Sequence, residues 1–345
     1  MNYFSECTQC PRKCNSARSQ GKSGFCGETD QVRIAVACLH FGEEPLITVH
    51  GGSGTIFFTG CTLRCAFCQN YQISQNGMGK AVTQDEFVEI CLKLQQAGAE
   101  NINLVTGSHF IPKLAEYLKA AKESGLTIPF CWNSSAYESV EMLELLKPYV
   151  TIWLPDLKTL NSDLSKKLFA AQDYPQTATN AISWMIKNFP LKTIECPAPK
   201  DYTDSNGEKW KKDEIKEKMT QGVIVRHLFL PGKFEETAET LLWLKENADG
   251  KACISLMNQY TPVPFAEDES KSKTRKASLS AIENRLVSKD EDTDLQDLIE
   301  AYDFDYLFYQ ELTDDTSWLP DFTRTQPFSN KLATPVWHWK EGFLS

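Results

Sequence analysis

Three closely spaced cysteines are the residues of this sequence best placed to do chemistry. Cys61, Cys65 and Cys68 follow one another with the spacing C-x3-C-x2-C. Thiolates at such short offsets can bind one iron–sulfur cluster, and three ligands leave one iron of a four-iron cluster open to another molecule. Twelve cysteines in 345 residues would produce this spacing by chance only about 0.015 times. The structural alternatives are a zinc knuckle and three unrelated core thiols.

A second set of cysteines lies near the amino terminus. Cys7, Cys10, Cys14 and Cys26 are spaced C-x2-C-x3-C-x11-C among glycine, serine, lysine and arginine. Such a segment has too few apolar residues to fold unaided, and a bound metal would supply the missing folding energy. Zinc and a second iron–sulfur cluster both fit, and a purely structural zinc site is the simpler of the two.

Composition excludes several classes of function. The net charge of −10 disfavours a nucleic-acid partner, which would need a basic surface. Neither a secretory leader nor an apolar run of 18 residues is present, so we expect no membrane association. Twelve cysteines without such a leader favour metal ligation over disulfides and indicate a cytoplasmic protein.

Hydrophobic periodicity predicts strands that alternate with helices along most of the chain. A first strand is expected within residues 30–39, ahead of the alternating part. The six strands of the alternation are expected at residues 55–59, 101–105, 127–132, 150–154, 222–230 and 252–257. Helices are expected at residues 82–97, 112–123, 139–146, 160–171, 179–189 and 235–246. The alternation predicts an α/β fold with a parallel sheet, closed far enough to make a partial (β/α)6 barrel.

Three domains follow from these patterns. We expect a cysteine-rich segment at residues 1–50, the barrel at 51–262 and an extension at 263–345. Charge-rich stretches predict a helix at 209–219 and a solvated or mobile segment at 267–294, and the aromatic tail should pack across the open side of the barrel. Cys91 lies on an apolar helical stripe and is expected in the core. Glu43 and Glu44 are interpreted as a solvated turn, with an acidic pair facing the substrate as the alternative.

Polar residues follow each predicted barrel strand. In a parallel barrel, catalytic groups lie where the strands end, at the carboxyl-terminal face. Polar side chains occur at these places. They are Thr106 to His109 after the second strand, Asn133 to Ser135 after the third, Asp156 to Lys158 after the fourth, Arg226 in the fifth, and Asn258 to Tyr260 after the sixth. Each position alone could be a helix cap, but their recurrence on one face indicates a site.

The cysteine spacing resembles that of the radical S-adenosylmethionine (SAM) superfamily, whose signature is C-x3-C-x-aromatic-C, with Phe67 as the aromatic residue. The D-x-K element at 156–158 and the V-R-x-x-x-x-P-G element at 225–232 are similar to those of the pyruvate formate-lyase activating-enzyme-like branch. The resemblance implies a [4Fe–4S] cluster that chelates SAM. It also implies that Asp156, Lys158 and Arg226 help to bind SAM. With Phe67 of the signature and the strand-end residues Asn133 and Asn258, they make up the predicted cofactor-binding set. Residues 106–109 depart from the Gly-Gly-Glu-Pro element of activating enzymes.

The resemblance implies reductive cleavage of SAM to a 5′-deoxyadenosyl radical that abstracts hydrogen from a substrate. A protein glycine or another peptide residue is the predicted substrate, with a small metabolite as the alternative. The expected partners are a low-potential electron donor of flavodoxin or ferredoxin type and a substrate protein, with no nucleic acid and no membrane. An iron–sulfur electron carrier that binds no SAM is the remaining non-catalytic hypothesis.

Overall fold

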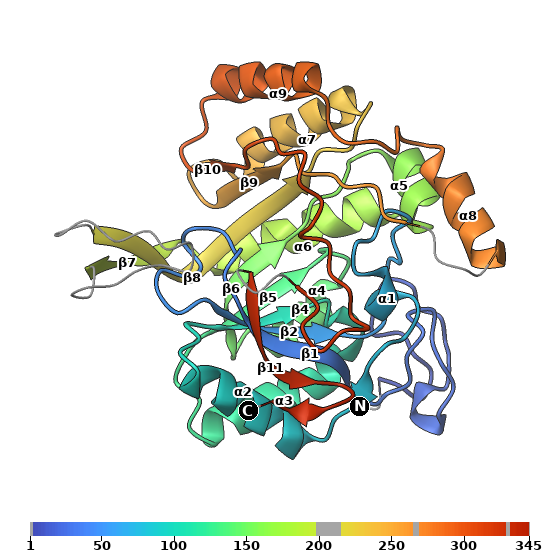
Figure 1. The fold of residues 1–345 in the computed structure, drawn as a ribbon, viewed down its shortest axis with the longest axis vertical. Coiled ribbons are helices and arrows are strands. Elements are labelled where there is room, and N and C mark those ends of the chain that lie inside the picture. Colours follow the sequence, from blue (N-terminus) through green and yellow to red (C-terminus); the bar gives the residue numbers. More distant parts are fainter. Residues whose placement is uncertain (1–2, 198–214, 265–268, 329–331, 345) are drawn as a thin grey trace.

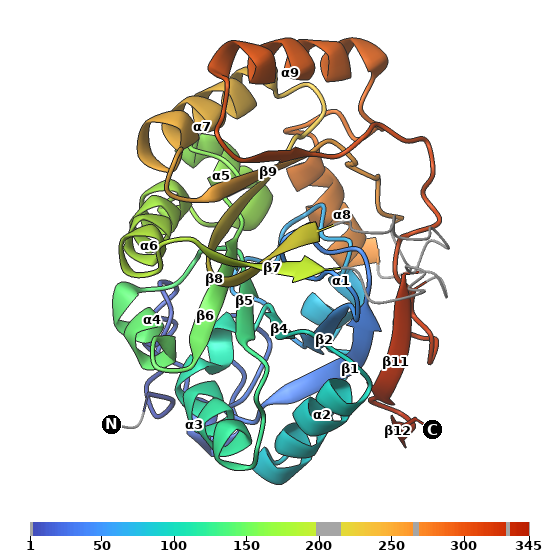
Figure 2. The ribbon, with the colours of Figure 1, turned by 90° about the vertical axis from the view of Figure 1, so that its left-hand side faces the viewer.

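A curved, mostly parallel sheet forms the centre of the molecule in the computed structural model, which describes residues 3–197, 215–264, 269–328 and 332–344. The strand order is β10-β9-β8-β6-β5-β4-β2-β1-β11-β12. The six predicted barrel strands are all present: β2 (Ser53–Phe58), β4 (Ile102–Val105), β5 (Phe130–Ser134), β6 (Val150–Pro155), β8 (Ile215–Leu228) and β9 (Cys253–Met257). Adjacent members pair in parallel, which confirms the partial barrel (Figures 1 and 2).

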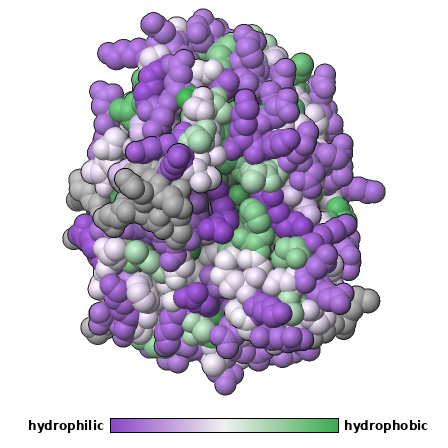
Figure 3. Space-filling model, turned by 90° about the vertical axis from the view of Figure 1, so that its right-hand side faces the viewer, coloured by the Kyte–Doolittle hydropathy of each residue, from purple (hydrophilic) through white to green (hydrophobic). Residues whose placement is uncertain are grey.

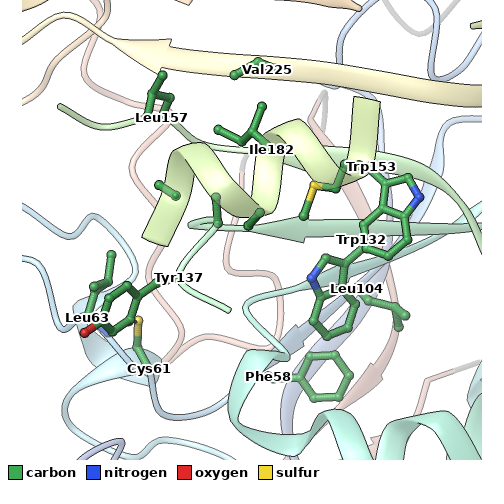
Figure 4. Packing of buried hydrophobic residues seen from close by; sticks show 14 of the residues in the cluster. Phe58, Cys61, Leu63, Leu104, Trp132, Tyr137, Trp153, Leu157, Ile182 and Val225 are labelled. Carbon is green, nitrogen blue, oxygen red and sulfur yellow. Dashed lines mark hydrogen bonds between the residues drawn. The ribbon is translucent and has the colours of Figure 1, made fainter. Parts of the chain in front are cut away.

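Helices cover the outer face of this sheet (Figure 2). They are α2 (Gln84–Gln96), α3 (Ile111–Glu123), α4 (Val140–Leu146), α5 (Ser162–Phe169), α6 (Tyr174–Asn188) and α7 (Phe234–Asn247). Side-chain caps begin two of them, because Thr83 accepts from the Glu86 amide before α2 and Asn161 accepts from two amides of α5. Large side chains such as Trp132 and Trp153 fill the layer between sheet and helices (Figure 4). Cys91 is fully buried in this layer, as predicted.

The aromatic tail adds strands to both ends of the sheet. Strand β10 (Leu307–Tyr309) pairs in parallel with β9, and β11 (Ala333–His338) pairs antiparallel with β1 (Arg33–His40) and with β12 (Gly342–Phe343). Between these strands, the rings of Phe322 and Phe328 pack on Phe57 at centroid distances of 5.7 and 5.3 Å. The tail therefore packs across the open side of the barrel, as the sequence predicted (Figure 1).

One prediction for the charged segments was wrong, the helix at 209–219. The segment 267–294, predicted to be solvated or mobile, contains α8 (Glu269–Leu279) and the start of α9 (Lys289–Tyr302), which begins with a capping box between Ser288 and Glu291, and many of its described side chains are exposed. Residues 215–219 of the predicted helix 209–219 belong to β8, and 209–214 lie outside the described residues. That half of β8 pairs antiparallel with β7 (Lys192–Pro197). The pairing outweighs the helix propensity of Lys and Glu.

Short elements complete the chain. The amino-terminal segment contains the 3-10 helix η1 (Arg18–Gln20), and α1 (Tyr71–Ser74) and β3 (Lys80–Ala81) follow the cysteine triad. Strand β1 falls in the predicted segment 1–50, yet it pairs with β2 and so extends the barrel sheet. Among the described residues, no helix is long and apolar enough to cross a bilayer.

Candidate active site at the carboxyl ends of the strands

The three cysteines of the triad lie together in the loop between β2 and α1. Cys61 and Cys65 are buried and Cys68 is partly exposed, and Cys65 interacts electrostatically with both others. Arg64 has a φ of +57°, the left-handed conformation that turns the loop sharply between the thiols. The Cys61 sulfur accepts from the Leu63 amide at 3.4 Å, and Figure 4 shows this residue beside Leu63 and Tyr137.

These donors fit an iron–sulfur cluster by their chemistry. All three are thiols, and burial raises the pKa of Cys68 and, more strongly, that of Cys65, so a positively charged centre is needed to hold both as thiolates. No set of three or more His, Cys, Asp or Glu side chains among the described residues is arranged to hold a metal ion. Phe67 is 8% exposed, and its ring packs against those of Phe169 and Tyr260. This packing supports the loop that carries the three cysteines.

Four of the predicted cofactor-binding residues form one network next to the triad. Arg226 donates from Nε to Asp156 Oδ1 at 2.9 Å, and a second guanidinium nitrogen, Nη2, lies 2.8 Å from the same oxygen. Lys158 Nζ donates to Asp156 Oδ2 at 2.8 Å. Arg226 also donates to Asn133 Oδ1 at 2.6 Å. The carboxyl ends of β5 and β6 meet β8 near its own carboxyl end here, as the strand-end argument predicted.

Opposite charges determine the protonation states in this network. Burial alone would raise the pKa of Asp156, but Arg226 and Lys158 outweigh it and hold that pKa below its ordinary value. The ammonium of Lys158 also lowers the pKa of Cys65, which places the network within electrostatic reach of the triad. The arrangement is a fixed set of charged and amide groups beside three thiols.

Asn258 is, besides Phe67, the other predicted cofactor-binding residue that is not part of this network. Its amide donates to Asp292 of α9 and, at 3.0 Å, to the hydroxyl of Tyr309 in β10, and its side chain is fully buried. The carboxyl-terminal extension covers the end of β9, and its residues Asp292 and Tyr309 accept the hydrogen bonds of this side chain. Strand β9 therefore contributes packing rather than an open polar group at this position.

The loop at 106–109 contributes buried polar groups of its own. Thr106 has a φ of +62°, and Ser108 donates a hydrogen bond to Glu138, a buried residue that the sequence analysis missed. The ring of His109 donates from Nε2 to the Thr59 carbonyl at 2.6 Å, and burial lowers the pKa of His109 to about 3. The imidazole is therefore neutral near pH 7.

The amino-terminal cysteines lie against the triad loop. Cys10 interacts electrostatically with the other three cysteines of its set, Cys7, Cys14 and Cys26, of which only Cys14 is exposed. The Cys61 amide donates to the Cys26 carbonyl at 3.2 Å. The fully buried Arg18 reaches the Cys7 sulfur at 3.5 Å and the His109 carbonyl at 2.8 Å. The two cysteine sets are therefore adjacent, although the sequence alone does not predict it.

Two further groups were misjudged or missed from sequence. Glu43 and Glu44 are not a solvated turn: their side chains are 8% and 10% exposed, and both interact with Arg226. Arg275 of α8 donates to the Cys68 carbonyl at 3.4 Å, so the extension holds the triad loop. Helices α1, α5 and α8 lie on the right-hand side of Figure 1, and Figure 3 shows that face with apolar side chains near its middle and polar ones around them.

Similarity to known proteins extends over most of the chain. The sequence model of the Radical SAM superfamily matches residues 55–213. An uncharacterized protein of Methanocaldococcus jannaschii, MJ0674, is 28% identical over 315 residues, which cover 89% of this chain and 78% of that protein.

Solved structures resemble the fold at low sequence identity. Streptococcus suis SuiB bound to S-adenosylmethionine is 15% identical with a TM-score of 0.46, covering 72% of this chain and 47% of SuiB. Methylornithine synthase (PylB) is 14% identical with a TM-score of 0.43, covering 74% of this chain and 70% of that one. The chain thus spans about half the length of SuiB.

Proposed function

We propose that this chain, which belongs to the radical SAM superfamily, cleaves SAM at a [4Fe–4S] cluster held by Cys61, Cys65 and Cys68 and abstracts hydrogen from a peptide substrate. The superfamily uses a [4Fe–4S] cluster and SAM. On receiving one electron, the cluster with bound SAM supplies methionine and a 5′-deoxyadenosyl radical. The pyruvate formate-lyase activating-enzyme-like branch named from the D-x-K and V-R-x-x-x-x-P-G elements is part of this proposal.

The observation that carries the proposal is the network of Asn133, Asp156, Lys158 and Arg226 beside the triad. Its members hold each other in place at distances of 2.6 to 2.9 Å, so their orientation is set before any ligand arrives. Arg226 and Lys158 can bind anionic and hydroxyl groups of SAM, and Asn133 can donate through its amide.

The proposed partners are a low-potential electron donor of flavodoxin or ferredoxin type and a protein that carries the target residue. The motifs at 156–158 and 225–232 support the peptide substrate. One observation favours a second candidate, a small metabolite: the tail adds β10 and β11 to both ends of the sheet and packs Phe322 and Phe328 on its inner residue Phe57. A barrel covered in this way suits a substrate that is enclosed completely.

Anaerobic reconstitution tests the proposal. The full chain is loaded with iron and sulfide, reduced with dithionite and incubated with SAM, and 5′-deoxyadenosine is measured by chromatography. We expect product from the wild type, and none from Cys61→Ala, Cys65→Ala or Cys68→Ala, each with about four fewer irons. The matched control is Cys196→Ala in β7, which should keep both the 5′-deoxyadenosine production and the iron content of the wild type. Product from a triple variant lacking all three thiols would refute the proposal.

Label transfer distinguishes the two substrate classes. Candidate partner proteins deuterated at glycine Cα and deuterated small metabolites are each incubated with the active enzyme. Deuterium in 5′-deoxyadenosine from a protein supports the peptide substrate, and deuterium only from metabolites supports the second candidate.

A further inference from the structure

A buried acidic pair lies beside Arg226 of the network. Glu43 and Glu44 belong to the loop that follows β1, and both interact electrostatically with the guanidinium of Arg226. The Glu44 Oε1 atom is 4.0 Å from Arg226 Nε, whereas Asp156 contacts the same guanidinium at 2.8 Å. Asp156 is therefore the closer ionic partner of Arg226, and the contact between Glu44 and Arg226 is longer by more than 1 Å.

We propose that Glu43 and Glu44 bind the cationic group, an ammonium or a guanidinium, of the substrate whose hydrogen is abstracted. This inference rests on the proposed function and adds the chemical class of the substrate to it. Lys158 of the network interacts electrostatically with Cys65 of the triad, and Arg226 of the same network interacts with the acidic pair, so the network connects the pair to the proposed SAM site.

The loop that carries the pair is held rigidly. Glu100 accepts hydrogen bonds from the amides of three successive residues, 49 to 51, and its other oxygen is 2.9 Å from Lys218 Nζ. Asn101 donates to the Ile47 carbonyl at 3.1 Å, and the Met219 amide donates to the Leu46 carbonyl at 2.7 Å. The fold therefore imposes the position of the carboxylates, as expected of a binding site and not of a solvated turn.

Charge is not balanced around the pair. Three carboxylates, those of Glu43, Glu44 and Asp156, face two permanent cations, Lys158 and Arg226. His40 Nδ1 lies 3.3 Å from Glu43 Oε1 and is the other basic group in contact with the pair. Burial and the negative charges of Glu43 and Asp156 raise the pKa of Glu44. A buried carboxylate without a close partner is costly, and a ligand cation would remove that cost.

Unsatisfied polar atoms point independently to a ligand. Among the described residues, Glu44 Oε2 has no hydrogen-bond partner, although nine-tenths of the side chain is buried. Asn103 on β4 is fully buried next to Glu43, whose pKa its amide helps to lower, and the Asn103 amide oxygen has no hydrogen-bond partner within that part of the chain. Buried amides are nearly always paired. An ammonium with three N–H donors or a guanidinium with five can donate hydrogen bonds to both Glu44 Oε2 and Asn103 Oδ1.

Cations and their uncharged isosteres provide the test. The reconstituted full chain with SAM is titrated calorimetrically with N-acetyl-lysine amide and N-acetyl-arginine amide, and with the corresponding amides of 2-aminoheptanoic acid and citrulline, which have side chains of matching length without the charge. We expect each cation to bind at least tenfold more tightly than its isostere. Equal affinities, or tighter binding of N-acetyl-glutamate amide, would overturn the inference.

Variants locate the binding, and free amino acids identify its source. Glu43→Gln and Glu44→Gln should each reduce the preference for the cation at least tenfold, whereas Glu235→Gln on the exposed side of α7 should not. Preference retained in both single variants would overturn the inference. Tighter binding of free lysine or arginine than of the capped amides indicates a metabolite, and the reverse indicates a peptide. SAM cleavage is measured separately, so failure of the proposed function and failure of this inference give different results.

Discussion

Asp156 is the residue on which the candidate site most depends, and the variant Asp156→Asn measures that dependence. The carboxylate receives two contacts from Arg226, at 2.8 and 2.9 Å, and one from Lys158 at 2.8 Å. Breaking a buried ion pair costs about 3–5 kcal/mol. Because these side chains remain 16–19% exposed, water can take over part of the contacts. We expect the variant to lose about 3 kcal/mol of unfolding free energy at pH 7.

The pH dependence has a definite sign. The folded-state pKa of Asp156 is below its unfolded value, so the stabilisation is complete above the unfolded pKa. It is lost as the pH falls through the folded pKa, where the wild type and the variant should converge. Anaerobic urea unfolding, followed by tryptophan fluorescence at a series of pH values, measures both.

The matched control is Asp294→Asn on the exposed side of α9, which should change stability by less than about 0.5 kcal/mol. A difference of less than that amount between Asp156→Asn and the wild type at neutral pH would refute the view that the network is a fixed, mutually stabilised unit. A loss that persists unchanged below the folded pKa would assign the effect to packing instead.

Three further predictions concern other parts of the chain. His227 is buried, and burial lowers its pKa to about 4, so only the unfolded state gains a proton as the pH falls from 6.5 to 5. His227→Gln should therefore lose less stability than the wild type over this pH range, measured by urea unfolding. An unchanged dependence of stability on pH would contradict this. Gly51→Ala should destabilise by more than about 2 kcal/mol, measured by urea unfolding, because its Cβ would lie 1.9 Å from the Gly98 carbonyl oxygen. The spacing of the amino-terminal cysteines predicts a second metal centre, so metal analysis of the anaerobic protein should find about eight irons, or about four irons and one zinc. About four irons alone would contradict this prediction.

The barrel was predictable because its signals are local. Each buried strand is a short apolar run, and helix starts such as Thr83 and Asn161 carry caps that the sequence displays directly. The strand-end rule placed Asn133, Asp156, Lys158 and Arg226 together for the same reason, since a parallel sheet brings its carboxyl ends to one edge.

The residues whose environment the sequence did not predict all have structural partners that lie far away along the chain. The charges at 215–219 suggested a helix, because their strand partner, β7, could not be recognised from composition. Glu43 and Glu44 precede Pro45 and have the composition of a surface turn, and only the folded barrel buries them against Arg226. Asn258 follows a strand as the rule requires, but α9 and Tyr309 reach it from at least 34 residues further along the chain.

The pairing of β11 with β1 joins residues separated by about three hundred positions, such as Val36 and His338. During synthesis, the outer edge of β1 stays unpaired until residues 333–338 have left the ribosome, and β9 waits for β10 in the same way. Unpaired strand edges recruit other chains, so the nascent protein is prone to aggregate until these late strands have joined the sheet.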